Sequence, residues 1–359
     1  MVVHNISSLF WHSKRVLLSG HTGFKGSWLS LWLQSMGADV CGVSLAPPTE
    51  PSLFDQAKVS NGMRHEIVDI RNFEKVDCVF QSFRPEIVIH MAAQPLVRLS
   101  YQEPIQTYAT NIMGTVHILE ASRRAKSVRA IVNVTTDKCY ENREWVWGYR
   151  EGDPMGGHDP YSSSKGCSEL ISSAYRRSFL EAEGIGMATA RAGNVIGGGD
   201  WAQDRLIPDI IRSLEQKDVL KIRNPNAIRP WQYVLEPLSG YLMLAEKLYL
   251  KASDVSGAWN FGPYDEDAKT VKWIVEKLSA KWGAITNLKL QSGEQPHEAH
   301  FLKLDISKAK QQLGWQPKWS LDTALDKIND WHRAWTDYED MRAKCISQIH
   351  EYNVKDEVL

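Results

Sequence analysis

Two side chains in the middle of the chain have the types and the spacing for proton transfer. Tyr161 precedes Lys165 by four residues, so on a helix the phenol and the amine lie one turn apart on one face. A free tyrosine has a pKa of about 10, but a nearby ammonium and an oxidised nicotinamide cation both favour the phenolate. Tyr161 would then take a proton from an alcohol while a hydride leaves for the cofactor. Alone, the same spacing also fits a surface pair on an amphipathic helix.

A second polar group, Thr136, Asp137 and Lys138, follows the apolar run 128–134. That run predicts a buried strand. Ionisable residues directly after a buried strand of an α/β sheet point into the ligand crevice. The Thr136 hydroxyl would share a substrate oxygen with Tyr161, which favours catalysis over a chance spacing.

The element that would hold a cofactor lies near the start of the chain. The apolar run 15–19 stops at Gly20, and the glycines Gly23 and Gly26 precede an apolar run with helical spacing. A helix start has free N–H groups and a positive dipole end, which attract a dinucleotide's pyrophosphate. Gly20 would allow the tight turn, Gly23 the approach of the phosphates, and Gly26 the contact between helix and strand. A plain glycine loop is the alternative.

The rest of the first half alternates between strands and helices. Further strands are predicted over 39–43, 65–70, 86–90, 128–134 and 186–191, and helices over 73–83, 103–125 and 161–183. This alternation predicts an α/β fold with a doubly wound, Rossmann-type parallel sheet, whose ligands lie beyond the carboxyl ends of the strands. Asp69, Ala92, Ala93 and Gln94 lie at such ends.

The regular alternation ends after Gly193, so we predict two domains. Residues 1–193 would form the NAD-binding domain, with some later segments returning to it. Residues 194–359 would form a smaller α/β domain for the substrate, with helices near 206–214, 238–250 and 271–281, a strand near 231–235 and a terminal helix from 321 onward.

Composition limits the partners. The 359 residues carry a formal net charge of −1, which does not favour nucleic acid. Five scattered cysteines without a CxxC pair disfavour disulfides and zinc, so we expect no metal and a cytoplasmic protein. The chain contains no apolar run long enough to span a bilayer and no signal-peptide core, so we expect no membrane contact.

The second predicted strand favours NAD over NADP. Ser44 lies where an acidic residue usually holds the ribose 2′-hydroxyl. No Arg or Lys lies between Lys25 and Lys58, so a cation for a 2′-phosphate is not evident there.

At these residues the sequence resembles the extended short-chain dehydrogenase/reductases that act on nucleotide-sugars, over nearly its whole length. The shared motifs are the GxxGxxG turn, Asp69-Ile70, His90 to Gln94, Thr110-Asn111, Gly114-Thr115, Thr136-Asp137, Tyr161 with Lys165, and Arg191 with Asn194. The resemblance implies NAD as cofactor. It implies a cofactor site formed by Gly20, Thr22, Gly23, Phe24, Gly26, Asp69, Ile70, Ala92, Ala93, Gln94, Asn111, Tyr161 and Lys165.

Within that family, an acid at Asp137 is similar to the 4,6-dehydratases, and epimerases generally lack it. The resemblance implies that Tyr161 is the base at C4, Lys165 its activator, Thr136 the oxygen anchor and Asp137 the acid that protonates the C6 hydroxyl. Lys138 replaces the glutamate of the dTDP-glucose members, as in the members that act on CDP-D-glucose. It would either act as the C5 base or stabilise the enolate.

The resemblance also implies a substrate site and an oligomer. Gln94, Asn194, Arg205, Arg229, Asn260 and His297 would contact CDP-D-glucose, although the arginines would equally fit surface charges. The product would be CDP-4-dehydro-6-deoxy-D-glucose, for deoxysugar and O-antigen lipopolysaccharide synthesis. Helices at 103–125 and 161–183 would pair between subunits in a homodimer or a dimer of dimers.

Three alternatives remain. A sugar-nucleotide 4-epimerase needs the same Tyr161 and Lys165 but no acid for C6. A 4,6-dehydratase for another nucleotide-hexose would use the same catalytic set. A non-enzymatic NAD-binding regulator could share the fold, because fold does not determine function.

Overall fold

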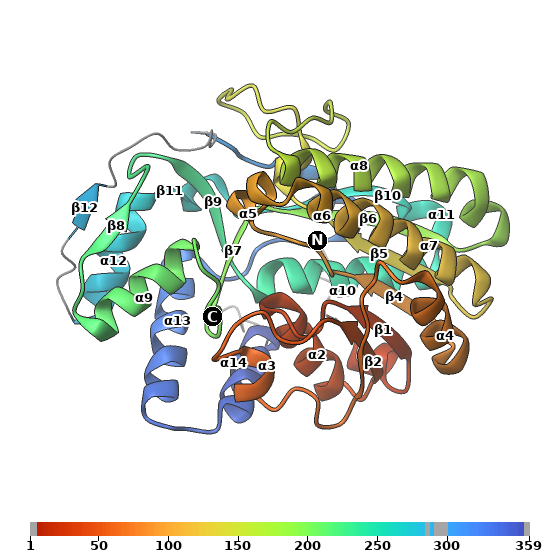
Figure 1. The fold of residues 1–359 in the computed structure, drawn as a ribbon, viewed down its shortest axis with the longest axis horizontal. Coiled ribbons are helices and arrows are strands. Elements are labelled where there is room, and N and C mark those ends of the chain that lie inside the picture. Colours follow the sequence, from red (N-terminus) through yellow and green to blue (C-terminus); the bar gives the residue numbers. More distant parts are fainter. Residues whose placement is uncertain (1–5, 284–287, 291–300, 355–359) are drawn as a thin grey trace.

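The computed structural model describes residues 6–283, 288–290 and 301–354, and its centre is a seven-stranded parallel sheet (Figure 1). The strands lie in the order β10-β6-β5-β4-β1-β2-β3. Their bounds are β1 Arg15–Ser19, β2 Asp39–Ser44, β3 Arg64–Ile67, β4 Ile87–His90, β5 Ala130–Val134, β6 Gly186–Ala192 and β10 Gly257–Phe261. This order confirms the predicted doubly wound sheet.

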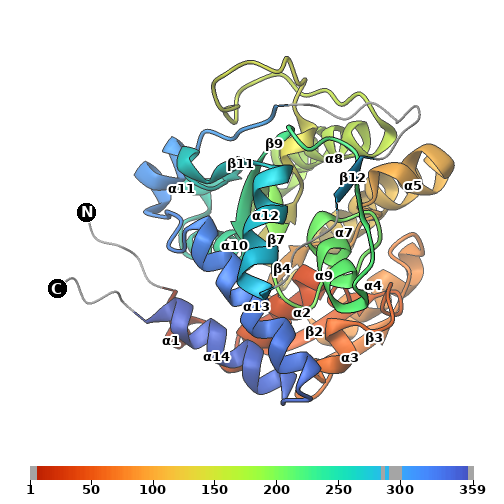
Figure 2. The ribbon, with the colours of Figure 1, turned by 90° about the vertical axis from the view of Figure 1, so that its left-hand side faces the viewer.

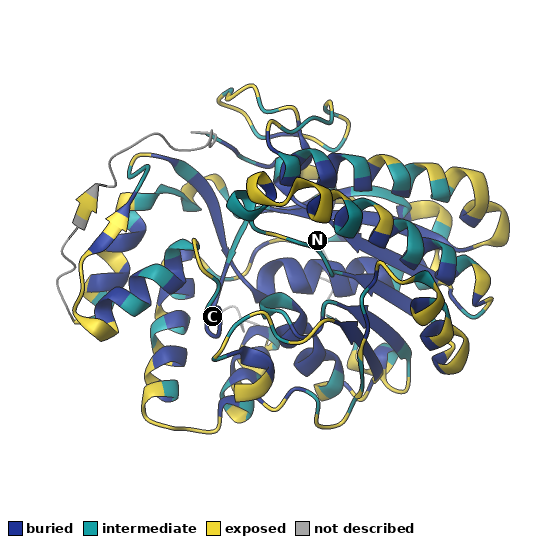
Figure 3. Ribbon diagram, viewed as in Figure 1, coloured by how far each residue is buried: buried dark blue, intermediate teal, exposed yellow. Residues whose placement is uncertain are grey.

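The central strands are apolar on both faces because helices cover both. In β1, Val16 and Leu18 pack into one core and Leu17 packs into the other, as alternation along a strand requires. The first core is covered by α2 (Phe24–Ser35) and α10 (Leu235–Leu250), and the second by α4 (Phe73–Phe83), α7 (Gly114–Arg124) and α8 (Pro160–Tyr175). Figure 3 shows the buried strands between helices whose outer faces are exposed.

The predicted helix over 103–125 is interrupted. It consists of α6 (Pro104–Tyr108), a π-helical turn (Ala109–Met113) and α7. Gly114 starts α7 against Ile70, where a Cβ would come within 2.4 Å of Ile70 Cδ1. Similarly, α8 continues through a π-helical turn (Arg176–Leu180) and a 3₁₀ turn (Glu181–Glu183). Hydrophobic periodicity alone does not reveal such changes of helical pitch.

The seventh strand comes from beyond residue 193. β10 pairs in parallel with β6, and α10 packs on β5 and β6. Two segments from beyond residue 193 therefore belong to the central sheet and its cover. The domain division itself stays a prediction.

Several of the remaining elements lie beside the central sheet at one end of the molecule. Figure 2 shows α12 and α13 side by side there. One small sheet contains β7 (Asn194–Ile196), β9 (Ile228–Tyr233) and β11 (Ala268–Thr270). A second contains β8 (Leu220–Ile222) and β12 (Leu288–Leu290). The other helices are α1 (Ser8–Trp11), α3 (Leu53–Gln56), α5 (Val97–Gln102), α9 (Leu206–Gln216), α11 (Ala252–Val255), α12 (Val271–Trp282), α13 (Leu321–Thr336) and α14 (Met341–Asn353), with short turns Asp137–Cys139, Asp265–Asp267 and Ala309–Leu313.

Candidate active site

The carboxyl end of β5 and the first turn of α8 meet at one pocket. Thr136 ends the strand segment in an extended conformation, and its hydroxyl donates to Asp137 Oδ1 at 2.9 Å. Asp159 caps α8 by accepting from the Ser162 backbone N–H at 2.9 Å, which fixes where the helix begins. Tyr161 lies in the first turn of this helix and lines the pocket together with Thr136.

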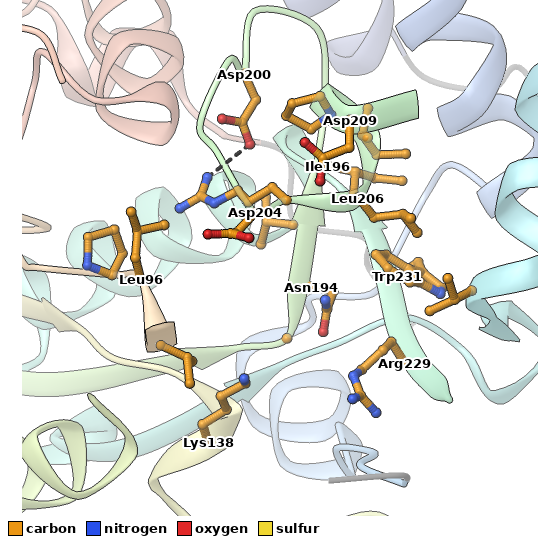
Figure 4. Close-up of a pocket in the computed structure, with 18 of the residues that line it drawn as sticks. Leu96, Lys138, Asn194, Ile196, Asp200, Asp204, Leu206, Asp209, Arg229 and Trp231 are labelled. Carbon is orange, nitrogen blue, oxygen red and sulfur yellow. Dashed lines mark hydrogen bonds and ion pairs between the residues drawn. The ribbon is translucent and has the colours of Figure 1, made fainter. Parts of the chain in front are cut away.

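Both parts of the chain contribute walls to this pocket. Thr136, Asp137, Lys138 and Tyr161 line it together with Asn194, Arg205 and Arg229, which come from beyond residue 193. In Figure 4 the Lys138 side chain extends toward Asn194, and Arg229 lies on the opposite side of Asn194. The structure thus brings together four predicted catalytic side chains and three predicted substrate contacts.

Lys165 lies behind the pocket lining. Its ammonium donates to the Val134 carbonyl at 3.2 Å. Burial lowers the pKa of Lys165 to about 8, against the opposing effect of the Glu169 carboxylate. Glu169 is itself buried and accepts hydrogen bonds from Thr135, Thr189 and Arg191. These bonds hold the middle of α8 against β6 and the residue that follows β5.

The protein's own groups do not make Tyr161 a ready base. Burial raises its pKa to about 12, while the hydrogen bond with Thr136 and the charge of Arg205 lower it. The Lys165 ammonium lies on the Val134 carbonyl, and its predicted role as activator of Tyr161 stays a prediction. A cation that enters the pocket would supply the missing stabilisation of the phenolate.

Asp137 is arranged as an acid. Burial raises the pKa of its carboxyl group above the usual range, although Lys138, Thr136 and Arg229 oppose the shift. Its Oδ2 is buried and has no hydrogen-bond partner in the structure. Gly193 leaves room for this oxygen, since a Cβ there would lie 3.1 Å from Oδ2 and 2.6 Å from Pro230 Cγ. A protonated carboxyl group with a free oxygen can donate a proton to a leaving group.

The glycine turn fits the pyrophosphate of a dinucleotide. Gly20 has a φ of 80°, and a Cβ on Gly26 would lie 2.0 Å from the Gly20 carbonyl oxygen. Gly23 is the N-cap of α2, and no side chain caps the free N–H groups of the first turn. Free N–H groups and the positive end of a helix dipole suit an anion, so this turn could hold the pyrophosphate that the spacing predicts. Phe24 lies in that first turn.

Several predicted cofactor residues have structural partners. The Thr22 hydroxyl bonds Ser44 Oγ at 2.8 Å and the Leu45 carbonyl at 2.9 Å, so it ties the turn to the end of β2. Asp69 accepts two hydrogen bonds from the Arg71 Nε atom. Ile70 is buried against Gly114.

A second group of predicted cofactor residues lies after β4. The Ala92 backbone N–H donates to Ser19 Oγ at 3.1 Å, and Ala93 follows in the same segment. Asn111 holds Gln94 by accepting from its backbone N–H at 2.8 Å and donating to its carbonyl at 3.1 Å. The Gln94 side chain bonds Leu96 and Thr107. It does not line the pocket described above.

Like Gln94, the predicted substrate contact Asn260 does not line this pocket. Asn260 is fully buried; its amide donates to the carbonyls of Tyr149 and Asp305, and its Oδ1 accepts from the Tyr140 hydroxyl. This placement corrects the prediction that Asn260 contacts the substrate, because its polar atoms make hydrogen bonds inside the protein. His297 lies outside the described residues.

Sequence reasoning missed Lys25 and Arg98. Lys25 lines the pocket, and burial, together with the charges of Lys165 and Arg205, lowers its pKa to about 7. Its place inside the glycine turn was the available signal. Arg98 lies on α5 and forms an ion pair with Asp204 across the pocket at 3.0 Å, which only tertiary structure reveals.

Within the described ranges, no group of three or more His, Cys, Asp or Glu side chains could hold a metal ion. No helix in the part of the chain that the structure describes is long and apolar enough to cross a membrane.

Comparison with known proteins identifies the family. The model of the family described as GDP-mannose 4,6 dehydratase matches residues 17–328. The chain belongs to this dehydratase family. A family member, the CDP-glucose 4,6-dehydratase of Salmonella typhimurium, is 57% identical over 352 residues, which cover 97% of this chain and 98% of that protein. The family name and this relative differ in the nucleotide, so family membership alone does not fix the base.

Solved structures agree with the dehydratase fold. The dTDP-glucose 4,6-dehydratase DesIV of Streptomyces venezuelae, solved with NAD bound, has a TM-score of 0.77 at 21% identity and covers 91% of this chain and 99% of that one. The UDP-glucose 4-epimerase of Thermotoga maritima has a TM-score of 0.78 at 23% identity and covers 90% of this chain and 99% of that one. Since dehydratase and epimerase share the fold equally well, the site must separate the two activities.

Proposed function

We propose that the chain catalyses the NAD-dependent dehydration of CDP-D-glucose to CDP-4-dehydro-6-deoxy-D-glucose. The relative that is 57% identical has this activity in its name, and it is matched along nearly its whole length. The uncapped start of α2 and the glycine turn support NAD as the cofactor. When bound, NAD would accept a hydride from the sugar and return it within one turnover.

Tyr161 and Thr136 would carry out the oxidation at C4. The Tyr161 oxygen takes the proton of the C4 hydroxyl, and the Thr136 hydroxyl, which lines the pocket with Tyr161, holds the same sugar oxygen. Lys165, fixed to Val134, positions the helix turn behind Tyr161. The product of this step is a C4 ketone, which makes the C5 hydrogen acidic.

Asp137 and Lys138 would carry out the elimination. Lys138, whose side chain reaches into the pocket, takes the C5 proton or stabilises the enolate. Asp137, whose pKa is raised by burial, donates its proton to the C6 hydroxyl, which leaves as water. A hydride then returns to C6 and a proton to C5, so the reaction consumes no net oxidant.

The observation that carries this proposal is the buried, partner-free Oδ2 of Asp137 beside Thr136 and Tyr161. An epimerase has no use for such an acid. The test is to incubate the protein and NAD with CDP-, dTDP-, UDP- and GDP-glucose in D₂O. We expect a 4-keto-6-deoxy product from CDP-glucose with deuterium at C5. A C4 epimer without deuterium at C5 would show an epimerase, and no turnover of any substrate would favour a regulator.

We also propose an oligomeric state, a cellular compartment and a biosynthetic role for the protein. The face formed by α5 to α7 and α8 exposes several large apolar side chains, namely Tyr101, Ile105, Tyr108, Met113, Leu170 and Phe179. Such a face supports a homodimer, or a dimer of dimers, through these helices. All five cysteines are free, which suits a reducing cytoplasm. A deoxysugar nucleotide would serve O-antigen lipopolysaccharide synthesis.

A further inference from the structure

One buried carboxylate ties α8 to the end of β5. Glu169 lies about two helical turns after Tyr161, and its side chain is only 5% exposed. Each of its two oxygens accepts one hydrogen bond from Arg191 and one from a threonine. Thr135 donates to Oε1 and Thr189 donates to Oε2. Because hydrogen bonds to a charged group are strong and directional, these four bonds fix the carboxylate in one orientation.

The two threonines differ in their place along the chain. Thr189 lies inside β6 and does not line the pocket. Thr135 does line the pocket, and it directly precedes Thr136 and Asp137. Because β5 ends at the residue before it, the Thr135 hydroxyl bonds to Glu169 just where the strand gives way to the pocket.

The same face of α8 makes a second bond at this strand end. The Lys165 ammonium donates to the Val134 carbonyl at 3.2 Å. Val134 and Thr135 are thus bonded to side chains one helical turn apart, and Tyr161 lies one turn earlier on that face. The placement of the residues after Thr135 relative to Tyr161 therefore depends on these two bonds.

We propose that Thr135 is a positioning residue for the dehydration. Through Glu169, its hydroxyl sets where Thr136 and Asp137 lie relative to Tyr161. A displacement of about 1 Å in such a set slows a reaction by about 100-fold, because the groups must meet the reacting atoms together. This inference rests on the proposed function and deepens it, since it assigns a role to a side chain that exchanges no proton with the substrate.

The alternative is that the bond from Thr135 only stabilises the fold, and the two threonines distinguish these roles. Replacing Glu169 itself would leave Arg191 buried without its partner, so the test changes the threonines instead. Thr135→Val and Thr189→Val each remove one hydroxyl from the same carboxylate and keep the size of the side chain. A bond that only stabilises the fold predicts the same result for both variants.

Steady-state turnover of CDP-glucose at saturating NAD measures the effect, and urea unfolding checks that each variant is folded. We expect Thr135→Val to lower kcat by about tenfold or more while KM stays within about twofold. Thr135→Ser retains the hydroxyl and should recover most of the kcat. Thr189→Val should keep kcat within about twofold of the wild type, because the strand end stays bonded to Glu169.

The opposite results overturn the inference. An unchanged kcat in Thr135→Val, an equal loss in Thr189→Val, or no recovery in Thr135→Ser would each do so. A change confined to KM would do so as well, because it would make Thr135 a substrate contact. If Thr135→Val does not fold, Thr135→Ala and Thr189→Ala are compared by the same criteria.

Failure of this inference is distinct from failure of the proposed function. A wild type that converts CDP-glucose, with Thr135 variants that match it, contradicts the positioning role alone. A wild type that converts no nucleotide-glucose contradicts the proposed function and the positioning role with it.

Discussion

At the scale of single residues, burial sets the proton affinities around the pocket. It raises the pKa values of Asp137 and Tyr161 and lowers those of Lys25 and Lys165. Burial therefore favours the neutral forms of the two acids and of the two amines. Such groups suit a site that must give and take protons near neutral pH. For Asp137, burial shifts the balance toward the protonated carboxyl group.

Replacing this acid separates the two halves of the reaction. Asp137→Asn keeps the size of the side chain but cannot protonate the C6 hydroxyl, so we predict that dehydration slows by about 100-fold to 10,000-fold. Oxidation at C4 should persist, because Tyr161 and Thr136 remain. The measurement follows both product formation and the absorbance of reduced cofactor in single-turnover experiments. Unchanged product formation would exclude Asp137 as the acid.

Spacing and strand position predicted that Thr136, Asp137 and Tyr161 lie together, because a strand end and a helix start place them at one pocket; their catalytic roles stay predictions. The lowered pKa of Lys25 could not be predicted from the sequence. It depends on burial and on the charges of Lys165 and Arg205, which are distant in sequence. Asn260 was wrongly placed because its partners, Tyr140 and Tyr149, are known only from the packed structure.

At the scale of elements, the glycine turn after β1 is the part most sensitive to a single methyl group. A Cβ on Gly26 would lie 2.0 Å from the Gly20 carbonyl oxygen, whereas a Cβ on Gly152 would meet no atom within 4 Å. We predict that Gly26→Ala lowers the free energy of unfolding by about 2–3 kcal/mol, because α2 must move away from β1. Urea unfolding measures this change.

The matched control for this turn is Gly152→Ala. We expect its unfolding curve and its NAD titration to resemble the wild type, while Gly26→Ala binds NAD more weakly because the N–H groups of α2 are displaced. Equal stability of the two variants would show that the turn tolerates a side chain at Gly26.

Periodicity predicted where the elements lie better than it predicted their internal geometry. The helix predicted over 73–83 has those bounds in the structure, with Asn72 as its cap. The segment 103–125 instead changes pitch around Ala109–Met113, because packing between α6, α7 and α8 decides the local turn. The sheet order and the seventh strand β10 depend on contacts between distant segments, which a local pattern does not contain.

At the scale of the whole molecule, one exposed face should determine assembly. Ile105 is 80% exposed within the apolar face of α5 to α8, and Leu9 is 88% exposed on α1. We predict that Ile105→Glu shifts the protein from dimer to monomer in sedimentation, because a buried unpaired charge opposes association. Leu9→Glu should leave the sedimentation unchanged. A wild-type monomer, or an Ile105→Glu dimer, would contradict the proposed interface.

Global stability should also depend on pH through His332. This side chain is buried beside Trp331, both its ring nitrogens lack hydrogen-bond partners, and burial lowers its pKa from 6.5 to about 3. Between those values the unfolded chain binds a proton that the folded chain does not, so stability falls as the pH falls below 6.5. The effect amounts to about 2 kcal/mol at pH 5.

His332→Phe should remove this part of the acid sensitivity. Denaturant unfolding at pH 5 and pH 7 measures it, and the variant should lose less stability between the two than the wild type does. His350, which is exposed on α14, provides the control His350→Gln, for which we expect the wild-type slope. An identical slope in His332→Phe would mean that His332 is not the responsible group.

The place of β10 in the sheet has a consequence for how the protein is made. Its five residues come from positions 257–261, yet they pair with the edge of β6. A nascent chain of which only the first 193 residues have left the ribosome therefore has an unpaired edge on β6. Nascent chains stalled before residue 261 should aggregate or recruit chaperones, and a gene split at residue 193 should yield two insoluble halves rather than a working pair.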